Sequence, residues 1–224
     1  MTPLKAGDIA PKFSLPDQDG EEVNLTDFQG QRVLVYFYPK AMTPGCTVQA
    51  CGLRDNMDDL KKAGVEVLGI STDKPEKLSR FAEKELLNFT LLSDENHQVC
   101  EQFGVWGEKS FMGKTYDGIH RISFLIDADG KIEHVFDDFK TSNHHDVVLN
   151  WLKEKRLMQS KTPGEEALAR RLFILIALVV DRQTIRPGMH HCFNQRGQRN
   201  GEEDAPESPQ SAKDHHRQDN HQRV

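Results

Sequence analysis

The sequence has no excess of basic residues. Its 35 acidic and 29 basic side chains give a formal net charge of −6 at pH 7 and an isoelectric point near 5.9. Nucleic acids and anionic lipid surfaces are bound mainly through clustered Lys and Arg. The composition therefore argues against binding to nucleic acid or to a membrane, and it favours a small-molecule or protein substrate.

The chain also lacks a recognisable secretory leader. Its first residues, MTPLKAGDIAPKF, do not combine a basic start with a long apolar segment. The apolar run at residues 172–180 has only about half of the roughly 20 residues that cross a bilayer. We interpret this run as a packed helix, with an exposed apolar segment or a surface anchor as alternatives. We expect a cytoplasmic protein.

Cysteine is scarce, and no Cys-x-x-Cys pair is present. In a reducing compartment the four cysteines are poor candidates for static disulfides, and they do not form the paired clusters of a structural zinc site. Cys46 and Cys51 nevertheless lie five residues apart in the stretch YPKAMTPGCTVQAC, directly after a strongly apolar segment. Buried, inert thiols are one interpretation of this pair, and redox chemistry is the other.

Between residues 10 and 138, short apolar runs alternate with segments of helical spacing, a pattern typical of an α/β domain. We predict strands at 13–15, 22–25, 32–38, 65–71, 89–94, 120–127 and 131–137, and helices at 47–63, 74–87, 97–105 and 144–155. The first two strands should pair as a hairpin, whereas residues 104–114 are interpreted as a loop. This order predicts a thioredoxin-like fold, in which helices flank a central mixed β-sheet.

The composition changes near residue 155. Residues 195–224 are dominated by polar, charged and proline residues, which bury too little apolar surface to offset the entropy of ordering the chain. We predict a domain at residues 1–155 and an atypical, largely disordered extension at residues 156–224. Because the extension lacks consistent patterning, an altered reading frame or a fusion is a hypothesis for its origin.

Cys46 is the candidate nucleophile. A thiol attacks only as its thiolate, and a free cysteine titrates near pH 8.5, so a reactive cysteine needs a positive environment. Pro44 and Gly45 fit the start of a helix, which places Cys46 in the first turn. Unpaired backbone N–H groups and the helix dipole favour an anion there.

Cys51 would lie in the same helix. Ideal helix geometry separates the two Cα atoms by roughly 8.7 Å. A disulfide spans at most roughly 7 Å between Cα atoms without backbone movement. Both thiols can therefore remain reduced in an intact helix, and joining them would require its first turns to unwind.

Three further residues are candidates for this site. The hydroxyl of Thr43 can donate to a thiolate or an incoming oxygen, and Pro39 can shape and dry a pocket without adding a donor. Arg121 begins the predicted strand at 120–127, and in a parallel sheet a residue at a strand end can reach the helix start and stabilise an anion. The alternative for Arg121 is a surface charge without a role.

These residues carry a resemblance to a known family. Pro39, Thr43 and Cys46 match the Pro-x-x-x-Thr-x-x-Cys motif of the peroxiredoxins. Cys51 resembles the second cysteine of the Q-type subgroup, also called bacterioferritin comigratory proteins or thioredoxin-dependent thiol peroxidases. The resemblance runs from about residue 3 to residue 153 and is closest to enterobacterial members of the group.

The resemblance implies a specific chemistry. Cys46 would be the peroxidatic cysteine, oxidised to a sulfenic acid by hydrogen peroxide or an organic hydroperoxide, and Cys51 would resolve it to an intramolecular disulfide. Thioredoxin or a similar dithiol protein would reduce that disulfide. Thr43 and Arg121 would hold the peroxide oxygens and the thiolate, and Pro39 would shield them. No metal or organic cofactor is implied, and members of the subgroup are often monomers.

Other reactive or aromatic residues receive simpler interpretations. We expect Cys100 to be a buried apolar thiol, with a backup resolving cysteine as the alternative. Cys192 lies beside two histidines in the extension, where an unpatterned cluster is favoured over metal capture. Trp106 and Trp151 should be packing residues, although Trp106 can also line a peroxide pocket. His144 and His145 are expected to be solvated.

Two other functions compete with peroxide reduction. A general dithiol oxidoreductase would share the architecture but normally uses the absent Cys-x-x-Cys pair. A redox-sensing or holdase-like binding module would expose apolar surface when its oxidised helix unfolds. That module would be oxidised slowly by peroxide and would need a peroxide-dependent partner.

Overall fold

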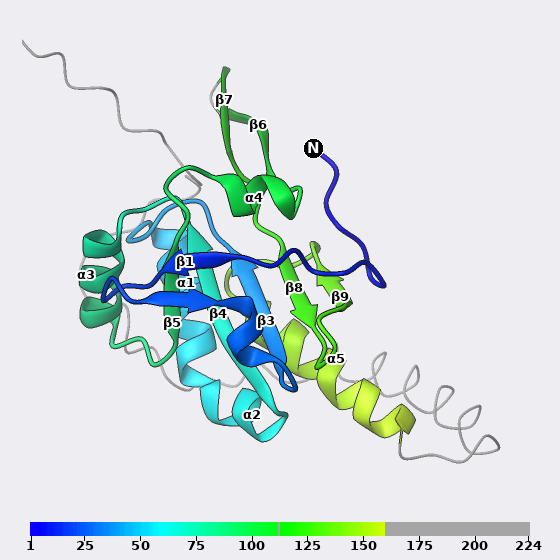
Figure 1. The fold of residues 1–224 in the computed structure, drawn as a ribbon. Coiled ribbons are helices and arrows are strands. Elements are labelled where there is room, and N and C mark those ends of the chain that lie inside the picture. The colour runs from blue at the N-terminus through cyan, green and yellow to red at the C-terminus, as the bar shows by residue number, and fades with distance from the viewer. Residues whose placement is uncertain (112, 160–224) are drawn as a thin grey trace, which may run out of the picture.

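The computed structural model describes residues 1–111 and 113–159 and builds them around a five-stranded mixed sheet (Figure 1). The strand order is β5-β4-β3-β8-β9. The central strand β3 pairs in parallel with β4 and antiparallel with β8, while β4 pairs in parallel with β5 and β8 antiparallel with β9. The sheet strands are β3 (Arg32–Phe37), β4 (Val65–Ser71), β5 (Thr90–Ser93), β8 (Ser123–Ile126) and β9 (Ile132–Phe136).

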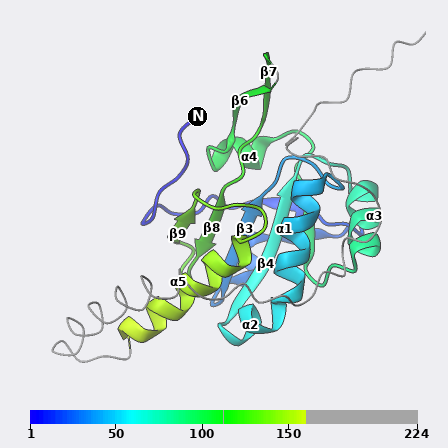
Figure 2. The same cartoon turned by 180° about the vertical axis from the view of Figure 1, so that it is seen from behind.

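Helices cover both faces of this sheet. Alternation along β3 directs Leu34 and Tyr36 to one face and Val33 and Val35 to the other. The first face packs against four helices, which Figure 2 shows in front of the sheet. These are α1 (Pro44–Asp55), α2 (Met57–Lys62), α3 (Pro75–Glu85) and α5 (His144–Gln159).

The opposite face of the sheet is covered by smaller elements. They are the predicted hairpin of β1 (Ser14–Pro16) and β2 (Glu22–Asn24), the 3-10 turn η1 (Leu25–Phe28) and α4 (Gln98–Gln102). Buried side chains from both faces form two apolar clusters separated by the sheet. This arrangement is the predicted thioredoxin-like one.

The helix predicted at 47–63 is two helices. Helix α1 ends at Asp55 and α2 begins at Met57, with Asn56 between them at φ −112° and ψ 13°. The Asn56 amide donates to the carbonyl of Gly52 at 2.9 Å, so the side chain competes with the backbone for the helical acceptor. The predicted stop at Gly64 is confirmed, since this residue has a left-handed φ of 72°.

The predicted loop at residues 104–114 is wrong. Residues 106–111 and 114–119 form the two strands of a hairpin, β6 (Trp106–Phe111) and β7 (Lys114–Ile119), which projects from the sheet beside α4 (Figure 1). Its strands carry glycines and charged residues in place of an apolar alternation, so they lack the periodicity by which strands are recognised. Trp106 stacks on His97 with ring centroids 4.3 Å apart, and Trp151 stacks on His134 at 4.7 Å, as expected of packing residues.

The last described helix passes the predicted domain boundary. Helix α5 runs to Gln159, so the boundary at residue 155 falls inside it. Residues 160–224 lie outside the described part of the chain, as do the apolar run at 172–180 and Cys192. Within residues 1–111 and 113–159, no helix is long and apolar enough to cross a membrane.

Candidate active site

The N-terminus of α1 positions Cys46. Thr43 is the N-cap residue, with extended backbone angles of φ −81° and ψ 151°, and Pro44 is the first helical residue. Cys46 therefore lies in the first turn, as predicted, and its side chain is only 1% exposed. The first backbone N–H groups of the helix lack intrahelical partners, so an anion on this sulfur lies in a favourable field.

Arg121 reaches Cys46, although the predicted geometry was wrong. Strand β8 begins at Ser123 and runs antiparallel to β3, so Arg121 precedes the strand, near the end of β3 from which the chain continues to α1. Both Nη1 and Nη2 of Arg121 lie 3.5 Å from the Cys46 Sγ atom. Two guanidinium donors to one sulfur stabilise a thiolate. They also stabilise a negatively charged oxygen that is bonded to that sulfur.

Behind Arg121 lies a chain of buried polar residues that the sequence did not reveal. Arg121 Nη1 donates to Oε1 of Gln49 at 2.6 Å, and the Gln49 Nε2 atom lies 3.1 Å from Nδ1 of His144. The other ring nitrogen of His144, Nε2, lies 2.9 Å from the Ser123 hydroxyl. Gln49, Ser123 and His144 are all fully buried.

Donor and acceptor rules give this chain one direction. Because Arg121 can only donate, Gln49 must present its carbonyl oxygen to Arg121 and its amide nitrogen to His144. The His144 Nδ1 atom is then an acceptor, and its Nε2–H donates to Ser123. Burial, followed by the charges of His145 and Arg121, lowers the pKa of His144 to about 3, so the ring stays neutral at physiological pH.

The expectation that His144 is solvated was therefore wrong. Helix α5 approaches α1 closely at Gly52, where a Cβ atom would lie 2.5 Å from the Nδ1 atom of His145. This approach buries His144 completely and leaves the side chain of His145 only 18% exposed. In the sequence, two histidines at the start of a helix look like a solvent-exposed helix end. Only the packing of α5 against α1 shows that they are covered.

We expect the His144→Leu variant to reduce peroxide about tenfold more slowly. Leucine leaves the buried Gln49 amide without an acceptor, at a cost of about 1–3 kcal/mol, and the amide then no longer holds Arg121 in place. Asparagine can place an oxygen near the lost Nδ1 atom, so His144→Asn should recover most of the rate. The measurement is the second-order rate constant for the reaction with peroxide at pH 7, with melting temperatures as controls. If His144→Leu and His144→Asn react at the same rate, His144 does not act by accepting the Gln49 hydrogen bond.

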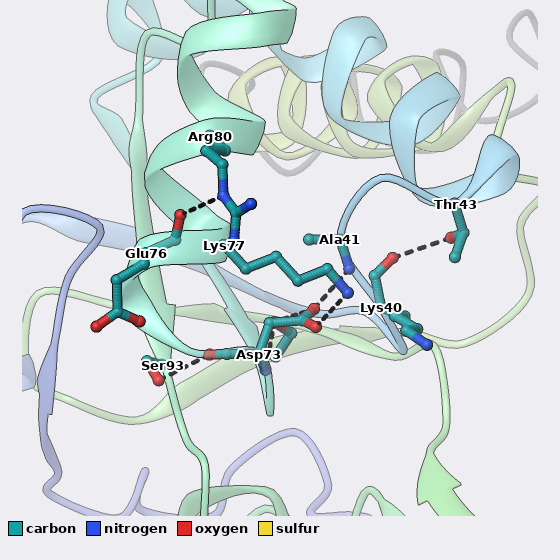
Figure 3. Close-up of polar contacts among 9 residues, drawn as sticks. Lys40, Ala41, Thr43, Asp73, Glu76, Lys77, Arg80 and Ser93 are labelled. Atoms are coloured by element: carbon teal, nitrogen blue, oxygen red, sulfur yellow. Dashed lines mark hydrogen bonds and ion pairs between the residues drawn. The ribbon is translucent and has the colours of Figure 1, made fainter. Parts of the chain in front are cut away.

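The loop before α1 is tied to the sheet through Asp73. One carboxylate oxygen of Asp73 accepts the backbone N–H of Ala41 at 2.6 Å, and the other pairs with Lys77 Nζ at 2.8 Å (Figure 3). The Asp73 carbonyl accepts the hydroxyl of Ser93 at 2.7 Å. The loop also contains Met42, a non-glycine residue at φ 66°, so these bonds hold a backbone that is costly to form.

Thr43 and Pro39 lie on this loop. The Thr43 hydroxyl donates to the carbonyl of Lys40 at 2.9 Å, as Figure 3 shows, so it must rotate before it can donate to a sulfur or a peroxide oxygen. Its lone pairs can accept a hydrogen bond from a peroxide O–H without this rotation. Pro39 is half-buried between the end of β3 and the Asp73-bound Ala41. The roles of both residues stay predictions.

Cys51 lies on another side of α1. Its side chain is 5% exposed, and its Sγ atom lies 3.8 Å from the Oε2 atom of Glu85 at the end of α3. Helix α1 is continuous from Pro44 to Asp55, and both cysteines are in the reduced, thiol form. The two cysteines therefore coexist in reduced form in an intact helix, as the spacing predicted.

Cys100 is the buried apolar thiol that was expected. It is fully buried, and its backbone N–H donates to Asp94 at 2.8 Å. Burial, reinforced by the Asp94 carboxylate, raises the pKa of Cys100 far above its usual value, so this thiol is a poor nucleophile. Within residues 1–111 and 113–159, no three His, Cys, Asp or Glu side chains are grouped to hold a metal ion.

The chain belongs to the AhpC/TSA family, whose model matches residues 6–135. It is a peroxiredoxin with a thioredoxin-like fold, as the motif predicted. Peroxiredoxins are oxidoreductases that act as peroxidases. It is 97% identical over 154 residues to peroxiredoxin Bcp of Escherichia coli K12, which covers 99% of that protein and 69% of this chain. It is also 61% identical over 153 residues to a putative peroxiredoxin of Haemophilus influenzae, covering 99% of that protein and 68% of this chain.

Solved structures agree with this assignment. Peroxidoxin BcpB of Mycobacterium tuberculosis superimposes with a TM-score of 0.60 at 37% identity, over 67% of this chain and 97% of that one. A mutant of Xylella fastidiosa PrxQ gives a TM-score of 0.65 at 28% identity, over 70% and 99% of the two chains. The alignment to the Escherichia coli protein leaves 70 of the 224 residues outside it.

Proposed function

We propose that the chain reduces hydrogen peroxide and organic hydroperoxides with Cys46 as the peroxidatic cysteine. The observation that carries this proposal is the pair of Arg121 donors 3.5 Å from a sulfur in the first turn of a helix. A solved Xanthomonas campestris bacterioferritin comigratory protein is described by its alkyl peroxide reduction activity, which supports organic hydroperoxides as substrates. We further propose a cytoplasmic monomer that binds neither nucleic acid nor membranes.

The first step is an attack on the peroxide O–O bond. The Cys46 thiolate bonds to one oxygen and forms a sulfenic acid, while the other oxygen leaves as hydroxide or alkoxide and takes a proton to become water or an alcohol. The Arg121 donors stabilise the charge as it moves from sulfur to the leaving oxygen. Thr43 accepts or donates a hydrogen bond at the bound peroxide, and Pro39 limits access by water.

The second step couples chemistry to local unfolding. The Cys51 sulfur displaces hydroxide from the Cys46 sulfenic acid, which gives a disulfide and water. Because roughly 8.7 Å separates the Cα atoms in ideal helix geometry, the first turns of α1 must unwind. Thioredoxin or a similar dithiol protein then reduces the disulfide by thiol exchange.

One equivalent of hydrogen peroxide added to the fully reduced protein tests the proposal. We expect fast oxidation and a single product, a Cys46–Cys51 disulfide, identified by peptide mass spectrometry. A matched control is Cys100→Ser, which should give the same product at the same rate because Cys100 lies in the apolar cluster on the face of the sheet opposite Cys46. Slow oxidation, or disulfides scattered over the other cysteines, would refute the assignment.

A further inference from the structure

The end of α3 holds the second half of α1. Besides the contact between Cys51 and the Glu85 carboxylate at 3.8 Å, an Nη1 donor of Arg54 bonds to the backbone carbonyl of Glu85. The Asn88 amide in turn donates to the carbonyl of Arg54 at 3.3 Å. Residues 51–54 are thus attached to the segment that ends α3, both through their side chains and through the backbone carbonyl of Arg54.

This attachment determines which cysteine moves in the proposed cycle. The bonds at Arg54 and Glu85 keep Cys51 in place, whereas among the described residues no hydrogen bond joins the first turn of α1 to α3. Unwinding of that first turn brings Cys46 to Cys51. Cys51 therefore still touches the Glu85 carboxylate when the sulfenic acid arrives.

A carboxylate beside Cys51 creates an electrostatic conflict. The resolving sulfur must attack as a thiolate, but a negative charge 3.8 Å away disfavours a second negative charge on that sulfur. A Glu85 carboxylate that stays charged and takes no part in proton transfer therefore slows the attack of Cys51 on the Cys46 sulfenic acid. The conflict is removed if Glu85 takes the thiol proton while the new S–S bond forms, because the sulfur then never carries a full charge.

We propose that Glu85 is a catalytic residue of the resolving step and acts as its general base. The Cys51 thiol passes its proton to Glu85 Oε2 as its sulfur bonds to the Cys46 sulfur. The S–O bond of the sulfenic acid breaks, and the leaving hydroxide takes a proton from the newly formed carboxylic acid to become water. Glu85 ends as a carboxylate, so the proton is shuttled and no other reactant is needed. This assignment rests on the proposed pairing of Cys46 with Cys51.

Glu85 is also placed to exchange its proton during this step. Its side chain is half-buried at the helix end, so it contacts the thiol on one side while water can reach the other. An ordinary glutamate titrates near pH 4.3 and a thiol near 8.5, which makes the carboxylate a weak base for this proton. We therefore expect a contribution at or below the lower end of the usual range for general bases, about 10- to 100-fold.

The test compares Glu85→Gln with Glu83→Gln in the otherwise intact chain. Glutamine can still accept the Cys51 S–H hydrogen bond but cannot take the proton, whereas Glu83 is an exposed residue of the same helix. After one equivalent of hydrogen peroxide, dimedone trapping follows the Cys46 sulfenic acid and mass spectrometry follows the disulfide, between pH 5.5 and 9.5. The rate of sulfenic acid formation serves as the internal reference.

We expect Glu85→Gln to slow disulfide formation about tenfold or more at pH 7, and Glu83→Gln to match the original chain. The deficit should shrink as pH rises, since hydroxide then removes the thiol proton directly. The longer-lived sulfenic acid should also be overoxidised at lower peroxide concentration.

Three results would overturn the assignment. Equal or faster disulfide formation in Glu85→Gln would make the carboxylate a spectator or an electrostatic brake. A deficit that is constant with pH, or that extends to sulfenic acid formation, would indicate a disturbed helix. If the original chain forms no Cys46–Cys51 disulfide, the proposed pairing fails first, and the role of Glu85 fails with it.

Discussion

Replacing Cys46 with serine is expected to reduce peroxide turnover to the background rate. A serine hydroxyl in the same first turn is not ionised at pH 7 and is a weak nucleophile, whereas a cysteine beside Arg121 attacks as a thiolate. The measurement is peroxide consumption with thioredoxin and its reductase as the reducing system. Cys46→Ser should also form no disulfide with Cys51 after peroxide treatment.

If Cys46→Ser retained peroxide turnover, the reaction with peroxide would have to be assigned to another thiol. Cys51 is the alternative, because it lies in the same helix. It is nearly as buried as Cys46, but its sulfur contacts the carboxylate of Glu85. A Cys46→Ser protein that still consumed peroxide, together with an inactive Cys51→Ser protein, would reverse the proposed roles of the two cysteines.

Replacing Arg121 with alanine is expected to slow Cys46 oxidation by roughly 10²–10³-fold, the usual loss when a donor to a developing oxyanion is removed. Both guanidinium donors to the sulfur disappear, and Gln49 loses its partner. The measurement combines stopped-flow oxidation by peroxide with iodoacetamide alkylation at pH 7, which reports the thiolate fraction of Cys46.

Arg121→Lys is the matched control for this prediction. Lysine keeps the charge but replaces two parallel donors with a point charge, so it should restore alkylation more than it restores peroxide reduction. Arg121→Ala with the original rate and the original alkylation would show that the guanidinium has no role at this sulfur.

The sequence predicted the sheet strands and the cysteine helix because their signals are local. Residues 33–37 are uniformly apolar and residues 65–71 are mostly so, as expected of strands covered on both faces. Pro44, Gly45 and Cys46 likewise mark a helix start within three residues. The β6–β7 hairpin lacks such a signal, because it lies outside the five-stranded sheet and packs on the apolar cluster only at its ends, through Trp106 and Ile119.

The polar chain behind Arg121 could not be predicted for a different reason. Ser123 and His144 are 21 residues apart, and Gln49 and His144 are 95 apart, so only the packing of α5 against α1 and β8 brings them together. Gln49 alone carried a usable signal. It lies three residues after Cys46, which places both on the same side of a helix.

The two attachments of α1 also divide the stability of the domain into separate parts. Asp73 fastens Ala41 before the helix, and Glu85 fastens Arg54 near its end, so the opening required by the proposed cycle is a sub-global unit of about ten residues. The apolar cluster on the β1–β2 side of the sheet contains no residue of this unit and can stay closed while the unit opens, whereas the cluster on the α1 side includes Cys46 and Ala50. Thermostability and turnover are then separable traits. Substitutions that strengthen the cluster on the β1–β2 side can raise the melting temperature without slowing the cycle, whereas any that strengthen the first turn of α1 trade activity for rigidity.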